Sequence, residues 1–516
     1  MKITVQKRYM KFPVSPEMQP KRLLLKQNGQ VMADLVCAVD PISPQFWYYW
    51  DAREQLGQTY ELIWEPEIDY IPKFVDKVPT EGIYQERFRP TAHFSTSRGW
   101  INDPNGLVFY EGKYHMFYQH NPVAPVWGNM HWGHAVSSDL LHWEEMENAL
   151  FPDEFGTMFS GSAIIDTGNL TGLQENEHAP LLLYYTAAGN TSETSKNAKF
   201  TQCMAYSTDG GVTFRKYQNN PVVPHIVGDN RDPKVIYVPE ETCYYMALYL
   251  DGNEYGLLTS ENLLDWTMNQ RINLPGDAEC PDFFPLTTES GNRYWILIGA
   301  SDRYLVGKLQ NGQFTPVQDV KSLQIRGKAY AAQSFSGIPN DRRIRFSWNQ
   351  SVLPGCIANS SMSTPAELTL IEANQELWLC VNPIREYAAL TIDNQIASDS
   401  VLTLTGTAQD ILLELNVSDD AEIETSVFGL NFRISAAQNA LFVKDLTIPL
   451  FRENGILKLR LITDVHATEI YMADGRIFTC VDHIADRSLN RISVKTVQGT
   501  ADVLQLSASM LGNIWN

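Results

Sequence analysis

Three acidic residues in this sequence lie beside proline at the edges of β-prone runs. Asp103 belongs to W-I-N-D-P-N-G at 100–106, Asp232 to R-D-P, and Glu279 to E-C-P-D. Proline fixes φ, and Asn and Gly tolerate turn conformations, so each motif alone is typical of a tight turn. The β-prone run L-V-F-Y at 107–110 follows the first motif and places Asp103 at the edge of a strand. Because the same setting recurs far along the chain, we expect the three carboxylates to share one pocket.

Several carboxyl groups in one pocket can support the cleavage of a glycosidic bond. Cleavage needs one carboxylic acid to protonate the departing oxygen and one carboxylate on the opposite side of the sugar. A separation of about 5 to 5.5 Å makes the second group a nucleophile, and the product then keeps its configuration. A third carboxylate can bind sugar hydroxyls, since a charged hydrogen bond contributes roughly 1.5 to 3 kcal/mol.

The elements that position these residues are expected to be β-strands. At 516 residues the chain is too long for one ordinary core, which predicts two or three domains. Over residues 86–387, aromatic-rich β-prone runs recur with polar turns between them and almost no helical periodicity. The runs are Y-H-M-F-Y at 114–118, L-L-L-Y-Y at 181–185, C-Y-Y-M-A-L at 243–248, Y-W-I-L-I at 294–298 and R-I-R-F-S-W at 343–348. Five such units predict a five-bladed β-propeller, whose blades pack radially.

A small β domain is predicted before the propeller, over residues 1–85. Two β-prone runs flank Asn28-Gly29, which is a strong hairpin signal. The aromatic cluster F-W-Y-Y-W at 46–50 is expected to pack on the neighbouring domain, with stacking against a sugar as the alternative. Proline-rich sequence at 66–82 is interpreted as a linker to the propeller.

A β-sandwich is predicted after the propeller, over residues 388–516. Several runs there alternate apolar and polar residues at period two, so that one side of each strand is buried. We find no catalytic constellation in this region and expect Asp464, His466 and Asp474 to be ordinary surface and turn residues. The predicted fold class is therefore all-β, with a five-bladed propeller, a C-terminal sandwich and an additional small N-terminal domain.

The net charge and the cysteine positions limit which ligands and cofactors this protein is expected to bind. Forty basic residues against 60 acidic ones give a net charge of -20, which disfavours nucleic acid and anionic lipid and suits a neutral substrate. The first residues lack the apolar core of a signal peptide, and the longest apolar runs are too short to span a bilayer. Seven cysteines without C-x-x-C spacing favour free thiols over disulfides or structural zinc. We therefore expect a cytoplasmic protein that uses no cofactor and no metal, and we place no metal at His131 and His134, which would face different ways.

Seven motifs occur in an order and at a spacing that resemble glycoside hydrolase family 32, the invertases, inulinases and levanases that hydrolyse β-fructofuranosides. The resemblance covers about residues 90–516, and it implies a five-bladed propeller followed by a β-sandwich. The motifs are W-I-N-D-P-N-G at 100–106, F-Y-Q at 117–119, W-G-N-M-H-W-G-H at 127–134, F-S-G-S at 159–162, R-D-P at 231–233, E-C-P at 279–281 and Y-A-A-Q-S-F at 330–335. The segment before residue 86 is a departure from the shortest members of the family.

The resemblance implies a role for each carboxylate. Asp103 would attack the anomeric C2 of a fructosyl unit and form a covalent intermediate, while Glu279 would protonate the leaving group and then activate water. To hold a proton near neutral pH, Glu279 needs surroundings that disfavour its charged form, and the negative charge of Asp103 acts in that direction. Asp232 would bind fructosyl hydroxyls and stabilise the transition state, with Arg231 holding it ionised. The alternative for Asp232 is a turn residue paired only with Arg231.

The same motifs imply a substrate-binding set around the carboxylates. Its polar members are Asn102, Gln119, Ser160 and Arg231, and its walls are Trp127, Phe159, Tyr330 and Trp348. Core packing is the alternative for Trp348 and Tyr330, because both lie in β-prone runs. Cys280 adjoins the acid, but no histidine lies near it in sequence, so we assign it packing or a weak hydrogen bond and not nucleophilic catalysis.

Three functions fit this sequence. The first is an exo-acting β-fructosidase that releases fructose from sucrose, fructo-oligosaccharides, inulin or levan. The second is a fructosyltransferase in which a sugar replaces water as the acceptor, and the third is a fructan-binding propeller without catalysis. The preference between β-2,1 and β-2,6 linkages is expected to depend on loops at the pocket mouth, such as the polar stretch at 190–197.

Overall fold

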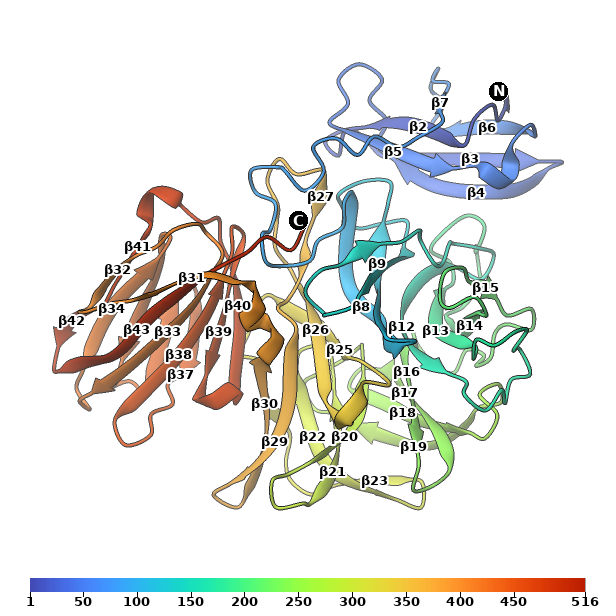
Figure 1. Ribbon diagram of the computed structural model, residues 1–516. Helices are drawn as coiled ribbons and strands as arrows, with labels where there is room; N and C mark the ends of the chain where they lie inside the picture. Colours follow the sequence, from blue (N-terminus) through green and yellow to red (C-terminus); the bar gives the residue numbers. More distant parts are fainter. Residues whose placement is uncertain (516) are drawn as a thin grey trace.

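Five sheets, each built on four antiparallel strands, follow one another through the middle of the chain in a computed structural model that describes residues 1–515 (Figure 1). The first strands of consecutive sheets contact one another in turn, and β25 returns to contact β8, so the sheets form a closed ring. The strands in chain order within each sheet are β8 (Gly99–Tyr110), β9 (Lys113–Asn121), β10 (His131–Ser137), β11 (Glu144–Glu145); β12 (Thr157–Ile165), β13 (Leu181–Ala188), β14 (Thr201–Ser207), β15 (Arg215–Lys216); β16 (Arg231–Val238), β17 (Cys243–Asp251), β18 (Glu254–Ser260), β19 (Thr267–Asn273); β20 (Asp282–Thr287), β21 (Arg293–Ile298), β22 (Arg303–Gln310), β23 (Gln313–Pro316); and β25 (Ala329–Ser334), β26 (Arg343–Asn349), β29 (Ala366–Ala373), β30 (Glu376–Pro383). The predicted five-bladed propeller is confirmed.

Short strands complete and close the ring. β24 (Lys321–Ser322) pairs with β22, and β28 (Ser361–Met362) pairs with β26. β27 (Ala358–Asn359), which follows the second strand of the last blade, pairs in parallel with β8 of the first blade. The last blade is therefore tied by backbone hydrogen bonds to the strand that carries Asp103.

The segment before the propeller forms two small sheets that pack on each other. Their orders are β1 (Lys2–Thr4), β6 (Thr59–Glu65), β3 (Lys21–Gln27), β4 (Gln30–Cys37) and β5 (Phe46–Asp51), β2 (Tyr9–Val14), β7 (Lys73–Val75), with the short helix η1 (Arg53–Gln55) between β5 and β6. The predicted hairpin joins β3 to β4, and Asn28 and Gly29 have φ of 51° and 83°, the left-handed values that a two-residue hairpin turn requires. β7 lies within the stretch interpreted as a linker and pairs with β2.

The aromatic cluster at 46–50 serves mainly its own domain. Phe46 and Tyr48 are 3% and 5% exposed and belong to the core between the two N-terminal sheets. The expected packing on the neighbouring domain is therefore wrong for these two residues, because alternate residues of β5 point into the domain's own core. Tyr49 does face the propeller, where the Arg98 guanidinium lies 5.5 Å from its ring.

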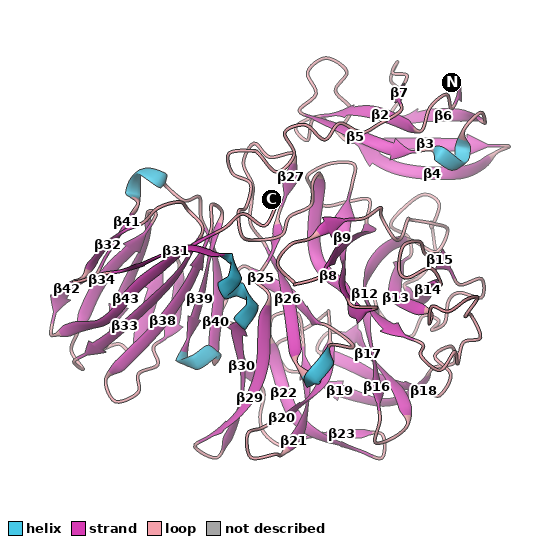
Figure 2. Cartoon of the chain, viewed as in Figure 1, coloured by secondary structure: helices cyan, strands magenta, loops and turns pink. Residues whose placement is uncertain are grey.

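Two larger sheets form the C-terminal sandwich. They are β31 (Thr391–Ile396), β43 (Ala501–Leu511), β33 (Gln409–Val417), β38 (Ile456–Thr463), β39 (Ala467–Met472), β40 (Ile477–Asp482) and β37 (Leu446–Pro449), β36 (Ala440–Val443), β35 (Leu430–Ser435), β34 (Glu422–Val427), β42 (Lys495–Gln498), with β32 (Val401–Thr403) and β41 (Arg491–Ser493) as a separate pair. Within residues 1–515, helical structure is limited to one-turn and two-turn segments, which Figure 2 shows in cyan between strands. Besides η1, they are η2 (Pro339–Asp341), η3 (Arg385–Leu390), η4 (Ala473–Gly475) and η5 (Arg487–Leu489).

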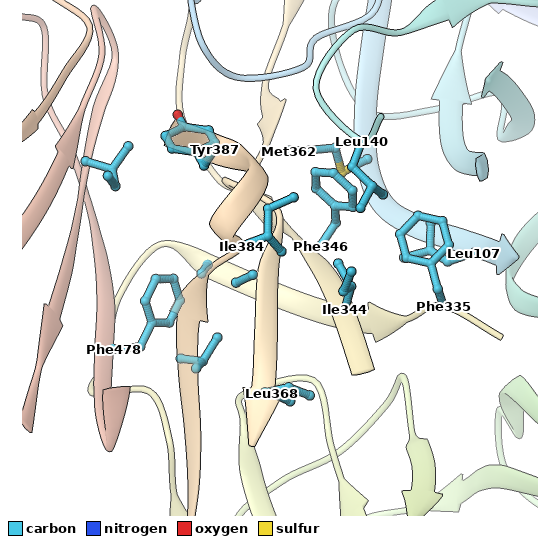
Figure 3. Close-up of a cluster of buried hydrophobic side chains, with 14 of the residues drawn as sticks. Leu107, Leu140, Phe335, Ile344, Phe346, Met362, Leu368, Ile384, Tyr387 and Phe478 are labelled. Carbon is cyan, nitrogen blue, oxygen red and sulfur yellow. The ribbon is translucent and has the colours of Figure 1, made fainter. Parts of the chain in front are cut away.

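The propeller and the sandwich share one apolar core. Figure 3 shows Phe346 of the last blade, Tyr387 of η3 and Phe478 of the sandwich in this cluster, all 3% exposed or less. A continuous core of this kind resists relative motion of the two domains, because separating them would expose apolar surface at a cost of about 25 cal/mol per Å².

A buried charged network lies beside that shared core. Asp464 accepts hydrogen bonds from the backbone N–H groups of Thr91 and Ala92 at 2.9 and 2.8 Å and contacts His93 Nδ1 at 3.0 Å. Glu469 lies 3.5 Å from His93 Nε2. The expectation that Asp464 and His466 are surface residues is wrong, since they are 0% and 1% exposed. Their sequence setting is that of a turn, but the turn is covered by the propeller.

Replacement of Asp464 by Ala is expected to destabilise the protein by about 3–5 kcal/mol, because it leaves buried donors and a buried histidine without their partner. Burial alone would lower the pKa of His93, but its hydrogen bonds with Asp464 and Glu469 raise that pKa from 6.5 to about 10. Burial would likewise raise the pKa of Asp464, yet His93 lowers it from 3.8 to about 2. The pair of Asp464 and His93 therefore stabilises the fold fully between about pH 4 and 6.5. This stabilisation is lost as the pH rises toward 10, where His93 loses its proton, and as it falls toward 2, where Asp464 gains one.

Thermal unfolding followed at pH 6 and pH 9.5 tests this, with the exposed Asp502→Ala in the same domain as control. The gap between the Asp464→Ala variant and the native protein should be largest at pH 6. A gap that is equal at both values would exclude the ionised pair as its source.

Candidate active site

The three predicted carboxylates meet at one end of the innermost strands. Asp103 lies in β8, Asp232 lies in β16, and Glu279 lies three residues before β20. Cys280 joins them, because its Sγ is 3.5 Å from Asp103 Oδ2 and 3.5 Å from Asp232 Oδ2, and it directly follows Glu279. The fold thus brings together residues that are 176 positions apart in the chain (279 minus 103).

A local irregularity recurs at this level in four innermost strands. The pairing register shifts between Ile101 and Pro104 in β8, and again in β12, β16 and β25, next to Ser160, Asp232 and Ala331. Such bulges re-aim side chains out of the alternating pattern of a strand. Asp232, Glu279, Cys280 and Ala331 also have positive φ, between 36° and 66°, in the left-handed region that non-glycine residues seldom occupy. Strained backbone concentrates at functional sites, where the surrounding structure holds it.

Asp103 is held in one orientation from three sides. Ser160 Oγ donates to Oδ2 at 2.6 Å, Asn102 Nδ2 donates to Oδ1 at 3.1 Å, and the Cys280 thiol approaches Oδ2. Burial raises the pKa of Asp103 above its usual value, while the hydrogen bonds from Ser160 and Asn102 oppose that rise. The result is a positioned carboxylate whose ionisation depends on its donors.

Replacement of Ser160 by Ala is expected to move the acid limb of the kcat/KM profile to higher pH. Ser160 stabilises the charged form of Asp103, and a hydrogen bond to a charged group contributes about 1.5–3 kcal/mol, or about 1 to 2 pKa units. Because a group with a raised pKa is charged only above it, activity should be lost at a higher pH as the medium is acidified. Ser160→Thr keeps the hydroxyl and is the control. Identical acid limbs in the native enzyme and the Ala variant would rule out this role for Ser160.

Asp232 is the most deeply placed of the three carboxylates and is 6% exposed. Its Oδ2 accepts from the backbone N–H of Cys280 at 3.0 Å, and its own N–H donates to Thr186 Oγ1 at 2.8 Å. Burial raises its pKa to about 7, and the charge of Arg231, whose Nε is 3.8 Å from Oδ2, acts against that rise. Asp232 is thus fixed as a hydrogen-bonding group, and the positive charge of Arg231 favours its ionised form.

Both carboxyl oxygens of Glu279 accept a hydrogen bond. Arg231 donates to Oε1 at 2.6 Å, and the Tyr330 hydroxyl donates to Oε2 at 2.6 Å. The Tyr255 hydroxyl donates to the backbone carbonyl of Glu279 at 3.1 Å, and the Arg231 guanidinium stacks 4.7 Å from the Tyr249 ring. Arg231 therefore contacts two of the three carboxylates and sets their relative position.

Two aromatic groups are linked to the carboxylates, one through Tyr330, which donates to Glu279, and one through Phe159, which precedes Ser160. In one, the Trp348 ring meets Trp100 and Tyr330 edge to face at 5.8 and 6.4 Å, and its Nε1 donates to Ser360 Oγ. In the other, Phe159 meets Trp127 at 6.3 Å. Trp127 is 59% exposed, so its ring is available to a ligand, whereas Trp348 is half-buried. Both groups are suited to contact the apolar faces of a sugar.

Gln119 has a different setting from the other predicted binding residues. It is 2% exposed, and its Nε2 donates to the Met158 carbonyl at 2.9 Å. This bond ties the first blade to the start of β12, directly before Phe159 and Ser160. In the structure Gln119 therefore holds the strand segment that carries Phe159 and Ser160.

The structure adds residues that the sequence did not point to. Thr186, Tyr255 and Tyr249 each position a carboxylate or Arg231, and Trp100 completes one aromatic wall. Thr186 and Tyr249 lie near the ends of strands whose starts were recognised as blade repeats, and that position is the one available signal. Cys280 was excluded as a nucleophile on sequence grounds, and burial together with the adjacent carboxylates raises the pKa of its thiol well above the usual value. A neutral thiol acts here as a hydrogen-bond donor.

Residues 1–515 contain no group of three His, Cys, Asp or Glu side chains arranged to hold a metal ion. His131 and His134 have separate surroundings, since His131 Nδ1 contacts the Asn129 carbonyl and His134 stacks on Phe117 at 4.2 Å. In the same part of the chain, no helix is long and apolar enough to cross a bilayer.

In this propeller, three carboxylates meet at one end of the innermost strands, with aromatic residues nearby. This is the arrangement of a glycoside hydrolase that uses carboxyl groups. The family model for the glycosyl hydrolases family 32 N-terminal domain matches residues 93–380, and the chain belongs to this family. The resemblance drawn from the motifs is confirmed.

Relatives extend the likeness beyond the propeller. A levanase from Bacillus subtilis (strain 168) is 32% identical over 497 residues, which cover 84% of this chain and 72% of the relative. An extracellular exo-inulinase from Aspergillus awamori is 26% identical over 520 residues, covering 84% and 96%. The crystal structure of an exo-inulinase from Aspergillus awamori has a TM-score of 0.74 at 23% identity and covers 84% of this chain and 100% of that one, so the two share a fold.

Proposed function

We propose that this protein is a retaining β-fructosidase that removes terminal fructosyl units from β-D-fructofuranosides. The observation that carries the proposal is the meeting of Asp103, Asp232 and Glu279 around Cys280 in a chain of family 32. Relatives named levanase, exo-inulinase and invertase, the last from Schizosaccharomyces pombe, support fructosides as substrates.

Asp103 is the proposed nucleophile. Its Oδ2 would attack C2 of the fructosyl unit and form a covalent ester, while the bond from C2 to the leaving oxygen breaks. Ser160 and Asn102 hold the carboxylate for this attack, and burial removes water that would otherwise solvate it.

Glu279 is the proposed acid and base. It would give its proton to the leaving oxygen in the first step and take a proton from water in the second, when water attacks C2 and releases Asp103. Tyr330 and Arg231 fix its two oxygens, so that the proton is delivered along one direction. Two displacements at C2 would leave the product with its original configuration.

Asp232 is the proposed transition-state stabiliser. Buried beside the nucleophile, it would accept hydrogen bonds from fructosyl hydroxyls, and it accelerates the reaction to the extent that these bonds strengthen as the ring flattens. Arg231 and the Cys280 amide favour its charged form and hold it in place.

A panel of sucrose, 1-kestose, inulin and levan, assayed side by side for released fructose, tests the proposal. Release from at least one substrate, with retained configuration by NMR, is the expected result. Accumulation of trisaccharides with little free fructose at high sucrose would show transfer to sugar in place of hydrolysis. Binding of fructan without any release would show a propeller that binds and does not cleave.

A further inference from the structure

The N-terminal domain lies against the propeller at two hairpin loops, above β8 to β15 in Figure 1. The first loop, 122–130, joins β9 to β10 and carries Trp127; the second, 189–200, joins β13 to β14 and ends at Phe200. The rings of Trp127 and Phe200 lie on Phe159 at 6.3 and 5.7 Å, and Phe159 precedes Ser160, the donor to Asp103. These three rings form one aromatic cluster, called the mouth wall below, and it includes the residue next to Ser160.

The first loop is anchored in the N-terminal domain by apolar and polar contacts. Val123 and Ala124, 0% and 5% exposed, belong to the core of that domain. Asn129 exchanges two hydrogen bonds with the backbone of Val36 in β4: the Val36 N–H donates to Oδ1 at 2.7 Å, and Nδ2 donates to the Val36 carbonyl at 2.9 Å. An amide that pairs with both backbone groups of one residue fixes the loop as a neighbouring strand would.

The second loop is anchored by Asp34 of the same strand. Its Oδ2 accepts from the backbone N–H groups of Glu193 and Thr194 at 2.6 and 3.3 Å. Arg22 of β3 lies 3.3 Å from Asp34 Oδ1 and 3.4 Å from Glu193 Oε2, which completes a charged bridge to the loop. The Asp34 side chain is 5% exposed, so these charge-assisted bonds are shielded from water.

The two anchors come from one edge strand and lie two residues apart. Asp34 and Val36 occupy β4, the outer strand of its sheet, and this edge would otherwise expose unpaired backbone groups. Here the edge holds loops from two different blades. Anchors in the N-terminal domain therefore hold both of the loops that carry Trp127 and Phe200.

We infer that the N-terminal domain is part of the substrate-binding site, in which β4 positions the mouth wall to bind the sugar unit next to the scissile bond. The inference rests on the proposed function. An exposed indole at the rim offers a flat face to a pyranose or furanose ring, while the fructosyl unit itself is held deeper by the carboxylates. Asp34 and Asn129 are positioning residues in this scheme, since they act through the loops.

The test compares a substrate that has a leaving sugar with one that lacks it. In the full-length enzyme, Asn129→Ala and Asp34→Ala should each raise KM for 1-kestose by about 5- to 10-fold, the effect of losing an aromatic contact, with kcat nearly unchanged. KM and kcat for methyl β-D-fructofuranoside, which has no leaving sugar, should stay at the native values. Glu61→Ala, an exposed change on β6 of the same sheet, is the matched control and should alter neither substrate.

A double-mutant cycle separates positioning of the wall from general loosening. Asn129→Ala should add nothing to the rise in KM for 1-kestose caused by Trp127→Ala, because it acts through that ring. Additive effects, or equal losses on both substrates, would overturn the inference, as would native behaviour of both anchor variants. If Asn129→Ala fails to fold, Asn129→Asp replaces it in the test and is judged by the same criteria. This variant keeps the acceptor for the Val36 N–H. If the native enzyme releases fructose from none of the substrates, the proposed function itself is wrong.

Discussion

Replacement of Asp103 by Asn is expected to lower kcat for sucrose or 1-kestose by at least about 10⁴-fold, on the scale of losing a catalytic nucleophile. The amide keeps the size of the side chain and can still accept from Ser160 Oγ, so the site should keep its shape. It cannot form a stable ester with C2, and no other group in contact with Asp103 is a suitable replacement, since the Cys280 thiol stays protonated. Steady-state release of fructose measures the loss.

Stability provides the control for this variant. Burial and the charge of Glu279 both disfavour ionised Asp103, so removing the charge should leave the melting temperature equal to or above the native value. An inactive variant with native or increased stability would assign the loss to chemistry. Near-native kcat would remove Asp103 from the mechanism.

Replacement of Glu279 by Gln is expected to lower kcat by about 10² to 10⁴-fold with natural leaving groups, the range for loss of a general acid. The amide can still accept from Arg231 at Oε1, so the side chain should keep its place, but it has no proton to deliver. A fructoside with a good leaving group, such as p-nitrophenyl β-D-fructofuranoside, needs less protonation and should lose less. The comparison of the two substrates in the same variant is the measurement.

Tyr330→Phe is the matched control for Glu279→Gln. It removes the hydroxyl that donates to Oε2 and leaves the carboxyl group intact, so its losses should be smaller and similar for both leaving groups. Equal losses of the two substrates in Glu279→Gln would contradict the proton-donor role.

Local patterns predicted most of the fold. Aromatic strand runs at regular intervals indicated the five blades, and Asn28-Gly29 indicated the hairpin between β3 and β4, because these signals depend on neighbours in the chain. The three acidic motifs were recognisable for the same reason: each combines an acid and a proline at a strand edge. Their convergence followed once the blades were known to form a ring.

Contacts between distant segments could not be predicted from the sequence. The bond between Thr186 and Asp232 joins positions 46 apart, and the contact between Asp464 and Thr91 joins positions 373 apart. Nothing in the local sequence of Asp464 distinguishes a covered turn from an exposed one. The aromatic cluster at 46–50 was misassigned similarly, because its period-two pattern says that one face is buried but not against what.

The register shifts beside Asp103, Ser160, Asp232 and Ala331 carry a consequence for protein engineering. In a regular propeller, grafting the same side chains onto unbroken strands would turn several of them into the space between blades. A designer who wishes to transplant this chemistry must insert the extra backbone residues first and choose the side chains second.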